Sequence, residues 1–276
     1  MLVMVRYGEI FLKGKNRSYF ENRLIENIRQ QCSASKVWKS RNRVFAELAD
    51  DRLHTLRFVF GIHSYSPIMV CSADYPSIQS SLLKMQEDLP RMARFRVSCA
   101  RQEKIWESSK EIERTVGAFI VERFLWKVDL KNFEVNIVLD VADSNHVYLS
   151  CSSHPGFGGL PVGVSGNVLA SLASKEDLSA ALLMLKRGCR IYLREPVATP
   201  LVQKLQAYSP FPLKTIVQER DSLSSHKIIA QINSASLDSL TILHDAKEQL
   251  STLYPLMGGS SCNHFDAPAD EREMPS

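Results

Sequence analysis

The spacing of apolar residues over the first fifty positions predicts an α+β domain with a single helix. The expected order is a strand, a loop, a helix and a hairpin, at residues 1–7, 8–16, 18 onward and 37–48. Ser18 and Glu21 have the Ser-x-x-Glu spacing of a capping box, which places the first turn of the helix here. The tip of the hairpin is basic, because it carries Arg41 and Arg43.

Residues 51–157 repeat this mixture of helix and strand and predict a second α+β domain. Its clearest helix begins at Ser108, where Glu111 completes another capping-box spacing. The apolar residues of this helix recur on one face, and they are Ile112, Val116, Phe119, Ile120 and Phe124. Strands that alternate between inward and outward residues are expected around it, at residues 95–100, 134–142 and 147–151.

A segment rich in glycine and proline at residues 154–166 predicts the linker to a third domain. Beyond it strands and helices alternate, at residues 168–172, 176–187, 189–193 and 199–208. Such alternation is typical of a parallel layer, so we expect a small α/β domain over residues 158–257. Residues 258–276 are rich in small residues, acidic residues and proline, and this composition predicts a disordered tail.

The composition is that of a globular chain, with 45% hydrophobic and 23% charged residues among 276. No apolar run approaches the roughly 20 residues of a membrane span, and the first residues do not resemble a signal peptide. The six cysteines show no Cys-x-x-Cys spacing, and the seven histidines show no spacing typical of metal ligands. We therefore expect a cytoplasmic chain with neither a disulfide scaffold, nor a metal site, nor a membrane as partner.

The net charge of +4 is small, but its positive excess lies in residues 1–50, where basic residues are twice as frequent as acidic ones. Lys13, Lys15 and Arg17 surround Gly14 directly before the predicted helix, and a helix N-terminus favours anions. This loop is therefore a candidate phosphate site. A solvated basic loop explains the same residues equally well.

A second group of basic residues belongs to the second domain. It consists of Arg96, Arg101, Lys104 and Lys127. A strand that presents basic side chains beside a capped helix can contact a sugar-phosphate backbone. The alternative is local ion pairing with the acidic residues of the same segment, Glu103, Glu107 and Glu111.

The aromatic residues divide into two groups. Five occupy periodic positions that packing in a core explains, and they are Tyr19, Phe45, Phe58, Phe60 and Phe119. Trp38 on the basic hairpin and Trp106 beside Lys104 are instead candidate platforms on which bases stack.

Five strings of sequence occur in order through the first two domains and the linker, at residues 6–17, 60–67, 95–98, 127–130 and 158–163. The first string reads Arg-Tyr-Gly-Glu-Ile-Phe-Leu-Lys-Gly-Lys-Asn-Arg, and the last reads Gly-Gly-Leu-Pro-Val-Gly. Together they resemble the tRNA 4-thiouridine synthetase (tRNA sulfurtransferase) family, which in many organisms also serves thiamine biosynthesis. The resemblance implies a ferredoxin-like domain over residues 1–50 and a THUMP domain over residues 51–157, which bind tRNA largely at its acceptor end.

The resemblance also implies RNA contact by the basic residues of both domains. These are Arg6, Lys13, Lys15, Arg17, Arg41, Arg43, Arg96, Arg101, Lys104 and Lys127.

The third domain departs from the family pattern. After its first strand the family has a Ser-Gly-Gly-x-Asp-Ser loop in a PP-loop, Rossmann-type α/β domain, which binds the pyrophosphate of the ATP that adenylates uridine. Here residues 173–178 read Ala-Ser-Lys-Glu-Asp-Leu. Glycines are needed there because a Cβ hinders the approach of the backbone to the phosphates. Ser174, Lys175 and Asp177 thus mark a vestigial nucleotide site in a truncated domain, although the cation of Lys175 could replace lost donors.

Cys262 is the one candidate catalytic residue. Cys-Asn-His-Phe at residues 262–265, with Pro268 close by, resembles the family's Cys-x-x-Phe-x-Pro string, whose cysteine carries a persulfide sulfur. A thiol left over from an ancestral site is the alternative.

These observations favour a tRNA-binding protein that has lost ATP-dependent adenylation and needs no cofactor. The alternative is an active tRNA sulfurtransferase that uses ATP and Cys262 and receives sulfur from a donor protein. A third hypothesis is an adaptor that presents tRNA to a separate catalytic subunit.

Overall fold

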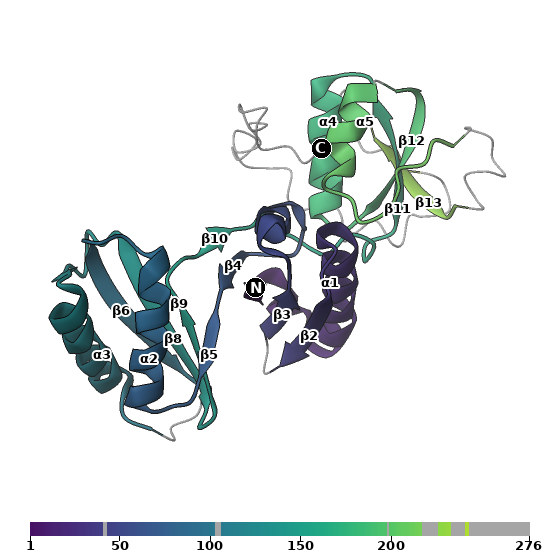
Figure 1. Cartoon of the computed structure of the whole chain (residues 1–276). Coiled ribbons are helices and arrows are strands. Elements are labelled where there is room, and N and C mark those ends of the chain that lie inside the picture. The colour runs from purple at the N-terminus through teal and green to yellow at the C-terminus, as the bar shows by residue number, and fades with distance from the viewer. Residues whose placement is uncertain (41–42, 103–105, 198, 217–225, 233–240, 243–276) are drawn as a thin grey trace. The chain divides into compact units, whose positions relative to one another are not determined.

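The computed structural model describes residues 1–40, 43–102, 106–197, 199–216, 226–232 and 241–242. The chain divides into two compact units, of which the first ends at Gly158 and the second begins at Gly159 (Figure 1). Among the described residues, the first unit contains two five-stranded sheets and the second unit contains one four-stranded sheet.

The first sheet is antiparallel and has the strand order β10-β4-β1-β3-β2. Its strands are β1 (Leu2–Arg6), β2 (Lys36–Ser40), β3 (Arg43–Glu47), β4 (Ser64–Pro67) and β10 (His154–Pro155). Its helices are α1 (Arg17–Cys32) and the 3-10 helices η1 (Glu9–Asn16) and η2 (Asp50–Phe58). Leu24 and Ile28 of α1 share a buried cluster with Val3 and Val5 of β1, so the helix covers one face of this sheet. The predicted strand, helix and hairpin are confirmed.

The start of α1 differs from the prediction. The expected loop before it is the 3-10 helix η1, and α1 begins at Arg17 rather than at Ser18. Asn16 stands at the N-cap and makes no side-chain cap hydrogen bond. Glu21 closes no capping box with Ser18, because its carboxylate accepts hydrogen bonds from three other side chains. A buried carboxylate gains more from such charge-assisted bonds than from one bond to a helix terminus.

Strands β4 and β10 extend the first sheet past the predicted domain boundaries. β4 pairs with β1, so residues 51–67 belong to the first domain although the sequence pattern assigns them to the second. β10 pairs with β4 and stacks His154 on Tyr65, with 5.3 Å between ring centroids. A Cβ on Gly156 would lie 2.3 Å from the carbonyl oxygen of Ile62, so this glycine permits a close approach of two backbones. The predicted linker therefore begins inside the first sheet.

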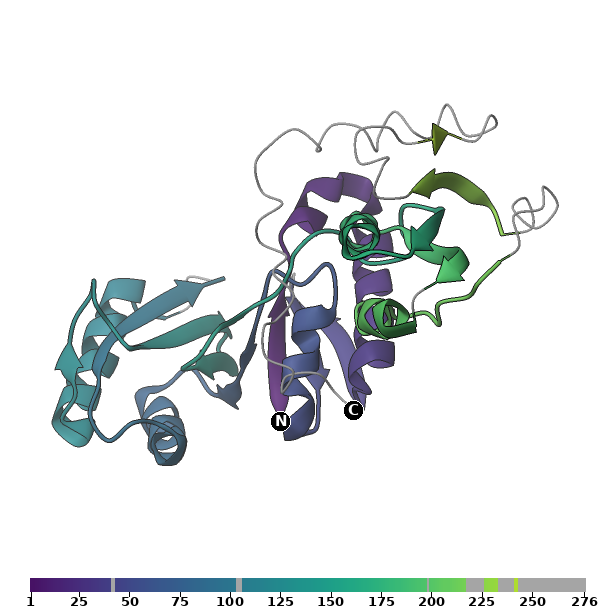
Figure 2. The same cartoon turned by 90° about the horizontal axis from the view of Figure 1, so that it is seen from above.

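The second sheet of the first unit has the strand order β5-β9-β8-β6-β7. Its strands are β5 (Met69–Cys71), β6 (Arg94–Arg101), β7 (Lys127–Val128), β8 (Val135–Asp143) and β9 (His146–Ser150). Its helices are α2 (Tyr75–Met85), the 3-10 helix η3 (Gln86–Asp88) and α3 (Ser109–Phe124). Both α-helices pack on one face of the sheet (Figures 1 and 2). Ser108 and Glu111 form the predicted capping box of α3, which confirms the predicted start of this helix.

The second unit has the strand order β12-β11-β13-β14. Its elements are β11 (Asn167–Leu172), α4 (Lys175–Lys186), β12 (Arg190–Val197), α5 (Thr199–Gln206), β13 (Ile228–Ile232) and β14 (Thr241–Ile242). β11 is parallel to both β12 and β13, and α4 and α5 lie side by side on the same side of the strands (Figures 1 and 2). The predicted parallel α/β layer is confirmed. The predicted tail at residues 258–276 lies outside the described residues.

No helix in the described part of the chain is long and apolar enough to cross a membrane.

Candidate nucleic-acid interface and nucleotide site

The basic segment before α1 is a folded element with a sharp turn in it. Gly14 has φ +51° and ψ −125°, a conformation that side chains with a Cβ rarely adopt. Lys15 is exposed next to this turn, and Lys13 places its ammonium group 5.2 Å from the centre of the Phe20 ring. The folded backbone around Gly14 thus fixes the positions from which both lysines can reach an anionic partner.

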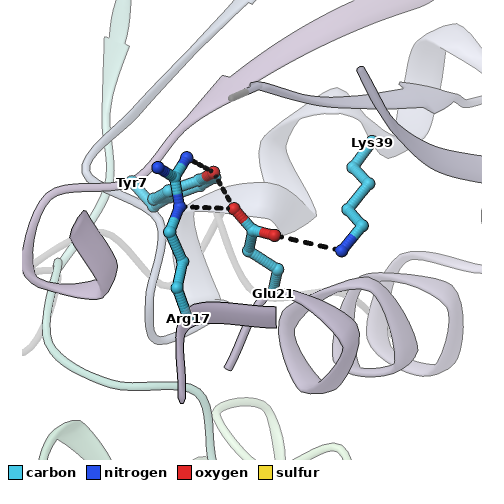
Figure 3. A network of polar contacts seen from close by, with 4 residues as sticks. All are labelled: Tyr7, Arg17, Glu21 and Lys39. Carbon is cyan, nitrogen blue, oxygen red and sulfur yellow. Dashed lines mark hydrogen bonds and ion pairs between the residues drawn. The ribbon is translucent and has the colours of Figure 1, made fainter. Parts of the chain in front are cut away.

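A buried network anchors this segment to the sheet (Figure 3). The carboxylate of Glu21, only 6% exposed, accepts hydrogen bonds from the Tyr7 hydroxyl at 2.5 Å and from Arg17 Nε at 2.7 Å. Lys39 of β2 donates to its other oxygen at 3.1 Å. Arg17 also donates to the Tyr7 hydroxyl at 2.8 Å. The network therefore ties the strand β1, the helix α1 and the strand β2 together at one point.

The network shifts the pKa values of its members. Burial raises the pKa of Tyr7 to about 12, and the hydrogen bond to Glu21 acts in the same direction. Burial alone would raise the pKa of Glu21, but the bonds from Tyr7, Lys39 and Arg17 outweigh it and hold that pKa below its usual range. Arg17, predicted to contact RNA, thus has two partners within the protein.

Two further predicted RNA-binding residues lie between the two domains of the first unit. Arg43 forms an ion pair with Asp140 of β8, and Arg6 donates to the hydroxyl of Ser66 at 2.9 Å. Burial raises the pKa of Asp140, whereas the nearby charges of Arg43 and Arg6 oppose this shift. Phe45 of β3 packs beside this group against Tyr148 of β9. Arg43 therefore joins the two sheets, and the charge of Arg6 lies close to the same carboxylate.

In the second domain, Arg101 is hydrogen-bonded within the protein, whereas Lys127 is exposed. Arg101 donates to the carbonyl oxygens of Trp106 and Glu107, and to the hydroxyl of Ser109. It therefore closes the turn before α3, and the expected pairing with the Glu107 carboxylate is not seen. Lys127 lies exposed on the edge strand β7.

Arg96 lies over the Phe133 ring, 3.9 Å from its centre. Trp106 packs against Tyr75, and Trp38 stacks on Phe45, so each proposed stacking platform has one side covered by protein. Arg41 and Lys104 lie outside the described residues.

The start of α4 contains Ser174, Lys175 and Asp177, the residues predicted to mark a vestigial nucleotide site. Ser174 is the N-cap, and its hydroxyl accepts from the backbone N–H of Asp177 at 3.1 Å. The Asp177 carboxylate, 5% exposed, accepts from the N–H of Ala173 at 3.0 Å and of Ser174 at 3.1 Å. The Ser-x-x-Asp spacing, a variant of the capping-box signal, is the sequence feature that could have indicated this arrangement. The backbone donors of this turn therefore already bind an anion of the chain itself.

The five described cysteines are buried or half-buried thiols, as expected for core residues. Burial raises the pKa of each, to about 11 for Cys32 and Cys99, to about 12 for Cys151 and Cys189, and upward for Cys71. Such thiols stay protonated at neutral pH and are poor nucleophiles. Cys262 lies outside the described residues. Within the described residues, no group of three or more histidine, cysteine, aspartate or glutamate side chains could hold a metal ion.

Two family models match the first unit. The ThiI ferredoxin-like domain matches residues 2–66, and the THUMP domain matches residues 75–152. The boundary between them agrees with the sheet pairing described above.

Relatives of known classification extend the match into the second unit. A probable tRNA sulfurtransferase from Mycoplasmopsis agalactiae is 35% identical over 201 residues, which cover 72% of this chain and 52% of the relative. One from Brevibacillus brevis is 35% identical over 198 residues, covering 68% of this chain and 49% of the relative. This chain thus spans about half the length of these curated relatives.

Solved structures share the architecture. A 4-thiouridine synthetase in complex with RNA and bound ATP matches with a TM-score of 0.64 and 26% identity, over 76% of this chain and 59% of that one. PH1313 from Pyrococcus horikoshii matches with a TM-score of 0.76 over 92% of this chain and 91% of that one, and its 24% identity shows the fold alone. With two family domains in this order and relatives of this kind, the chain belongs to the tRNA sulfurtransferase family.

Proposed function

We propose that this chain binds tRNA through its ferredoxin-like and THUMP domains and no longer adenylates it. The THUMP domain, the RNA-bound structural relative and the positive excess of residues 1–50 support the RNA-binding half of the proposal. Lys15 and Lys127 are exposed cations, one in each domain, and so can reach phosphates without breaking a contact described above. Arg6, Arg17, Arg43 and Arg101 act instead by holding the RNA-binding framework in shape.

The replacement of the family's two loop glycines by Ser174 and Lys175 is the observation that carries the loss of adenylation, because Asp177 itself matches the family pattern. A pyrophosphate bound at a helix start needs free backbone N–H groups and an approach without side chains. Here the N–H groups of Ala173 and Ser174 already bind Asp177, and Ser174 caps the next donor. An incoming phosphate would meet the side chains of Ser174 and Lys175, where the family has glycines that lack a Cβ. On this proposal the turn stabilises α4 and does not bind ATP.

Adenylation and sulfur transfer to the tRNA must then be carried out by another protein. On this proposal the chain presents its tRNA to a separate catalytic subunit, and no sulfur is carried on Cys262. ATP is accordingly no cofactor of this chain.

A paired titration with tRNA and with ATP tests both halves. We expect tRNA to bind at low salt, and the logarithm of its affinity to fall with the logarithm of salt by about 0.7 to 0.9 for each neutralised phosphate. We expect no heat of binding with ATP and magnesium at millimolar concentration. Absence of tRNA binding at low salt would end the RNA-binding half.

ATP binding, or release of AMP in the presence of tRNA, would contradict the second half. Two variants then identify the alternative chemistry. Loss of ATP binding in Lys175→Ala would show that the lysine replaces the missing backbone donors. Loss of tRNA thiolation in Cys262→Ser would establish an active sulfurtransferase.

A further inference from the structure

Exposed apolar side chains gather at the junction of η1 and α1. Phe11 is 49% exposed, Leu12 is 85% exposed and Tyr19 is 51% exposed. The periodic pattern places Tyr19 in the core, whereas the structure turns it toward solvent. A folded chain exposes single apolar residues routinely, but an aromatic group of this kind beside cations marks an interaction surface.

The aromatic rings of this junction are paired with cations. The guanidinium carbon of Arg17 lies 4.5 Å from the centre of the Phe11 ring, and Tyr7 packs against the same ring at 4.8 Å between centroids. Tyr19 meets Phe20 edge to face at 5.5 Å, and Phe20 in turn carries the Lys13 ammonium group. Phe11 and Tyr19 therefore each contact a neighbouring ring while about half of each residue stays exposed.

The charge of this junction selects the class of partner. Lys13 and Lys15 flank the Gly14 turn, whereas the charge of Arg17 beside them is paired with Glu21. The Glu21 carboxylate is buried and accepts hydrogen bonds from three donors, so it contributes little negative potential at the surface. A surface of exposed rings beside Lys13 and Lys15 is complementary to a polyanion that also carries flat apolar groups, which describes a nucleic acid strand.

The rigidity of the platform supports the same conclusion. Arg17 is held over Phe11 by its bonds to Glu21 and Tyr7, so the stacked pair is ordered before any ligand arrives. Preorganised aromatic side chains lose little conformational freedom on binding.

We infer that the Phe11–Tyr19 surface, formed by Phe11, Lys13, Lys15 and Tyr19, binds unpaired nucleotides of the RNA. Bases stack on Phe11 and Tyr19, and Lys13 and Lys15 bind the intervening phosphates. Only unpaired nucleotides fit, because bases within a duplex offer no free face to an aromatic side chain. The inference rests on the proposed tRNA binding. It adds that the ferredoxin-like domain recognises unpaired nucleotides of that RNA.

Fluorescence anisotropy with two RNA hairpins tests it. The hairpins share one stem, and only one of them carries a short unpaired overhang. Wild-type protein should bind the overhang hairpin more tightly than the blunt one. Phe11→Ala and Tyr19→Ala should each weaken binding of the overhang hairpin by about tenfold or more and leave the blunt hairpin nearly unchanged, in line with about 1–3 kcal/mol per stacked base.

Three further variants separate stacking from charge and from general damage. Phe11→Tyr keeps a ring and should keep the preference for the overhang. Lys15→Ala should reduce the salt dependence of binding by about one phosphate equivalent, whereas Phe11→Ala should leave that dependence unchanged. Met92→Ala removes an apolar side chain that is 81% exposed in the THUMP domain, and should change nothing.

A fluorescent reporter covers the case in which an alanine variant unfolds. In Phe11→Trp the overhang hairpin should quench the added tryptophan emission, relative to wild type, and the blunt hairpin should not. If wild-type protein binds neither hairpin, the proposed function itself fails. If it binds both hairpins and the variants lose affinity for both equally or for neither, tRNA binding stands and this inference is wrong, which leaves the surface to a protein partner.

Discussion

Glu21 shows how one residue can set the geometry of a binding segment without touching a ligand. Its two carboxylate oxygens accept from Tyr7, which directly follows β1, from Arg17 of α1 and from Lys39 of β2. Charge-assisted bonds in a buried place are stronger than their exposed counterparts. The position of Arg17 over Phe11, and with it the shape of the segment, therefore depends on this carboxylate.

The hydroxyl of Tyr7 should stabilise the protein in a manner that depends on pH. Tyr7→Phe removes one donor to Glu21 and one acceptor for Arg17, so we expect a loss of about 1–3 kcal/mol in the free energy of unfolding at pH 8. The pKa of Tyr7 is about 12 in the folded protein against about 10 when unfolded, so its contribution is complete below pH 10. The contribution is lost as the pH rises from 10 to 12.

Urea unfolding of wild type and Tyr7→Phe between pH 8 and pH 12 measures this effect. The difference in the free energy of unfolding between the two should shrink across the upper part of that range. Tyr19→Phe removes an exposed hydroxyl and serves as the control. A difference that stays constant from pH 8 to pH 12 would contradict the role given to Tyr7.

The same short pattern led to different structures at different places. Ser108 with Glu111 forms the capping box that the spacing predicts, whereas Ser18 with Glu21 does not. The difference lies in Tyr7 and other residues that pack around Glu21 from the sheet, and a local pattern carries no information about them. Sequence spacing proposed basic residues of both domains as RNA contacts, but it could not tell an exposed lysine from an arginine that is bonded to a buried partner.

At the scale of elements, the start of α4 shows how a serine and an aspartate together cap a helix. The Ser174 hydroxyl and the Asp177 carboxylate satisfy three backbone N–H groups at its start. Two of these groups, the N–H groups of Ser174 and Asp177, are among those that a helix cannot satisfy by itself. On the proposed function, a turn that binds phosphate in the family stabilises a helix here.

Removing this cap should destabilise the protein and should not create ATP binding. Ser174→Ala is expected to lower the free energy of unfolding by about 0.5–2 kcal/mol, because the N–H of Asp177 loses its acceptor. Ser179→Ala, which alters an exposed serine in the same helix, should stay within about 0.5 kcal/mol of wild type. Thermal unfolding of the three proteins makes the comparison. Equal stability of Ser174→Ala and Ser179→Ala would show that the cap contributes nothing.

The elements themselves were predictable, and their partners were less so. Period-2 and helical spacing located α1, α3, α4 and α5 and several of the strands, including β11 and β12 of the parallel layer, but not the helix α2 or the strand β13. The role of β4 and β10 was not predictable, because pairing with β1 and β4 depends on residues far apart in sequence. Domain boundaries drawn from composition therefore missed the edge of the first sheet.

At the scale of the whole first unit, a buried ion pair joins the ferredoxin-like domain to the THUMP domain. Arg43 and Asp140 meet between the two sheets, with Arg6 nearby and the Phe45–Tyr148 contact beside them. No sequence signal connects these residues, since they pair across two domains. If exposed Lys15 and Lys127 contact the same RNA, their separation is set by this junction.

Asp140→Asn should loosen that junction. The variant leaves Arg43 and Arg6 close together without a counter-charge, and breaking a buried pair in this way costs about 3–5 kcal/mol. The joint replacement of Arg43 by Met and Asp140 by Leu should recover most of this loss, because it removes both charges and refills the space with apolar groups. Urea unfolding gives the stability of each variant, and anisotropy with the overhang hairpin gives its affinity. A junction that only stabilises the protein would leave RNA affinity intact below the unfolding transition. A fall in the RNA affinity of Asp140→Asn under those conditions would therefore show that the junction also positions the two domains on one RNA. Unchanged affinity would confine its role to stability.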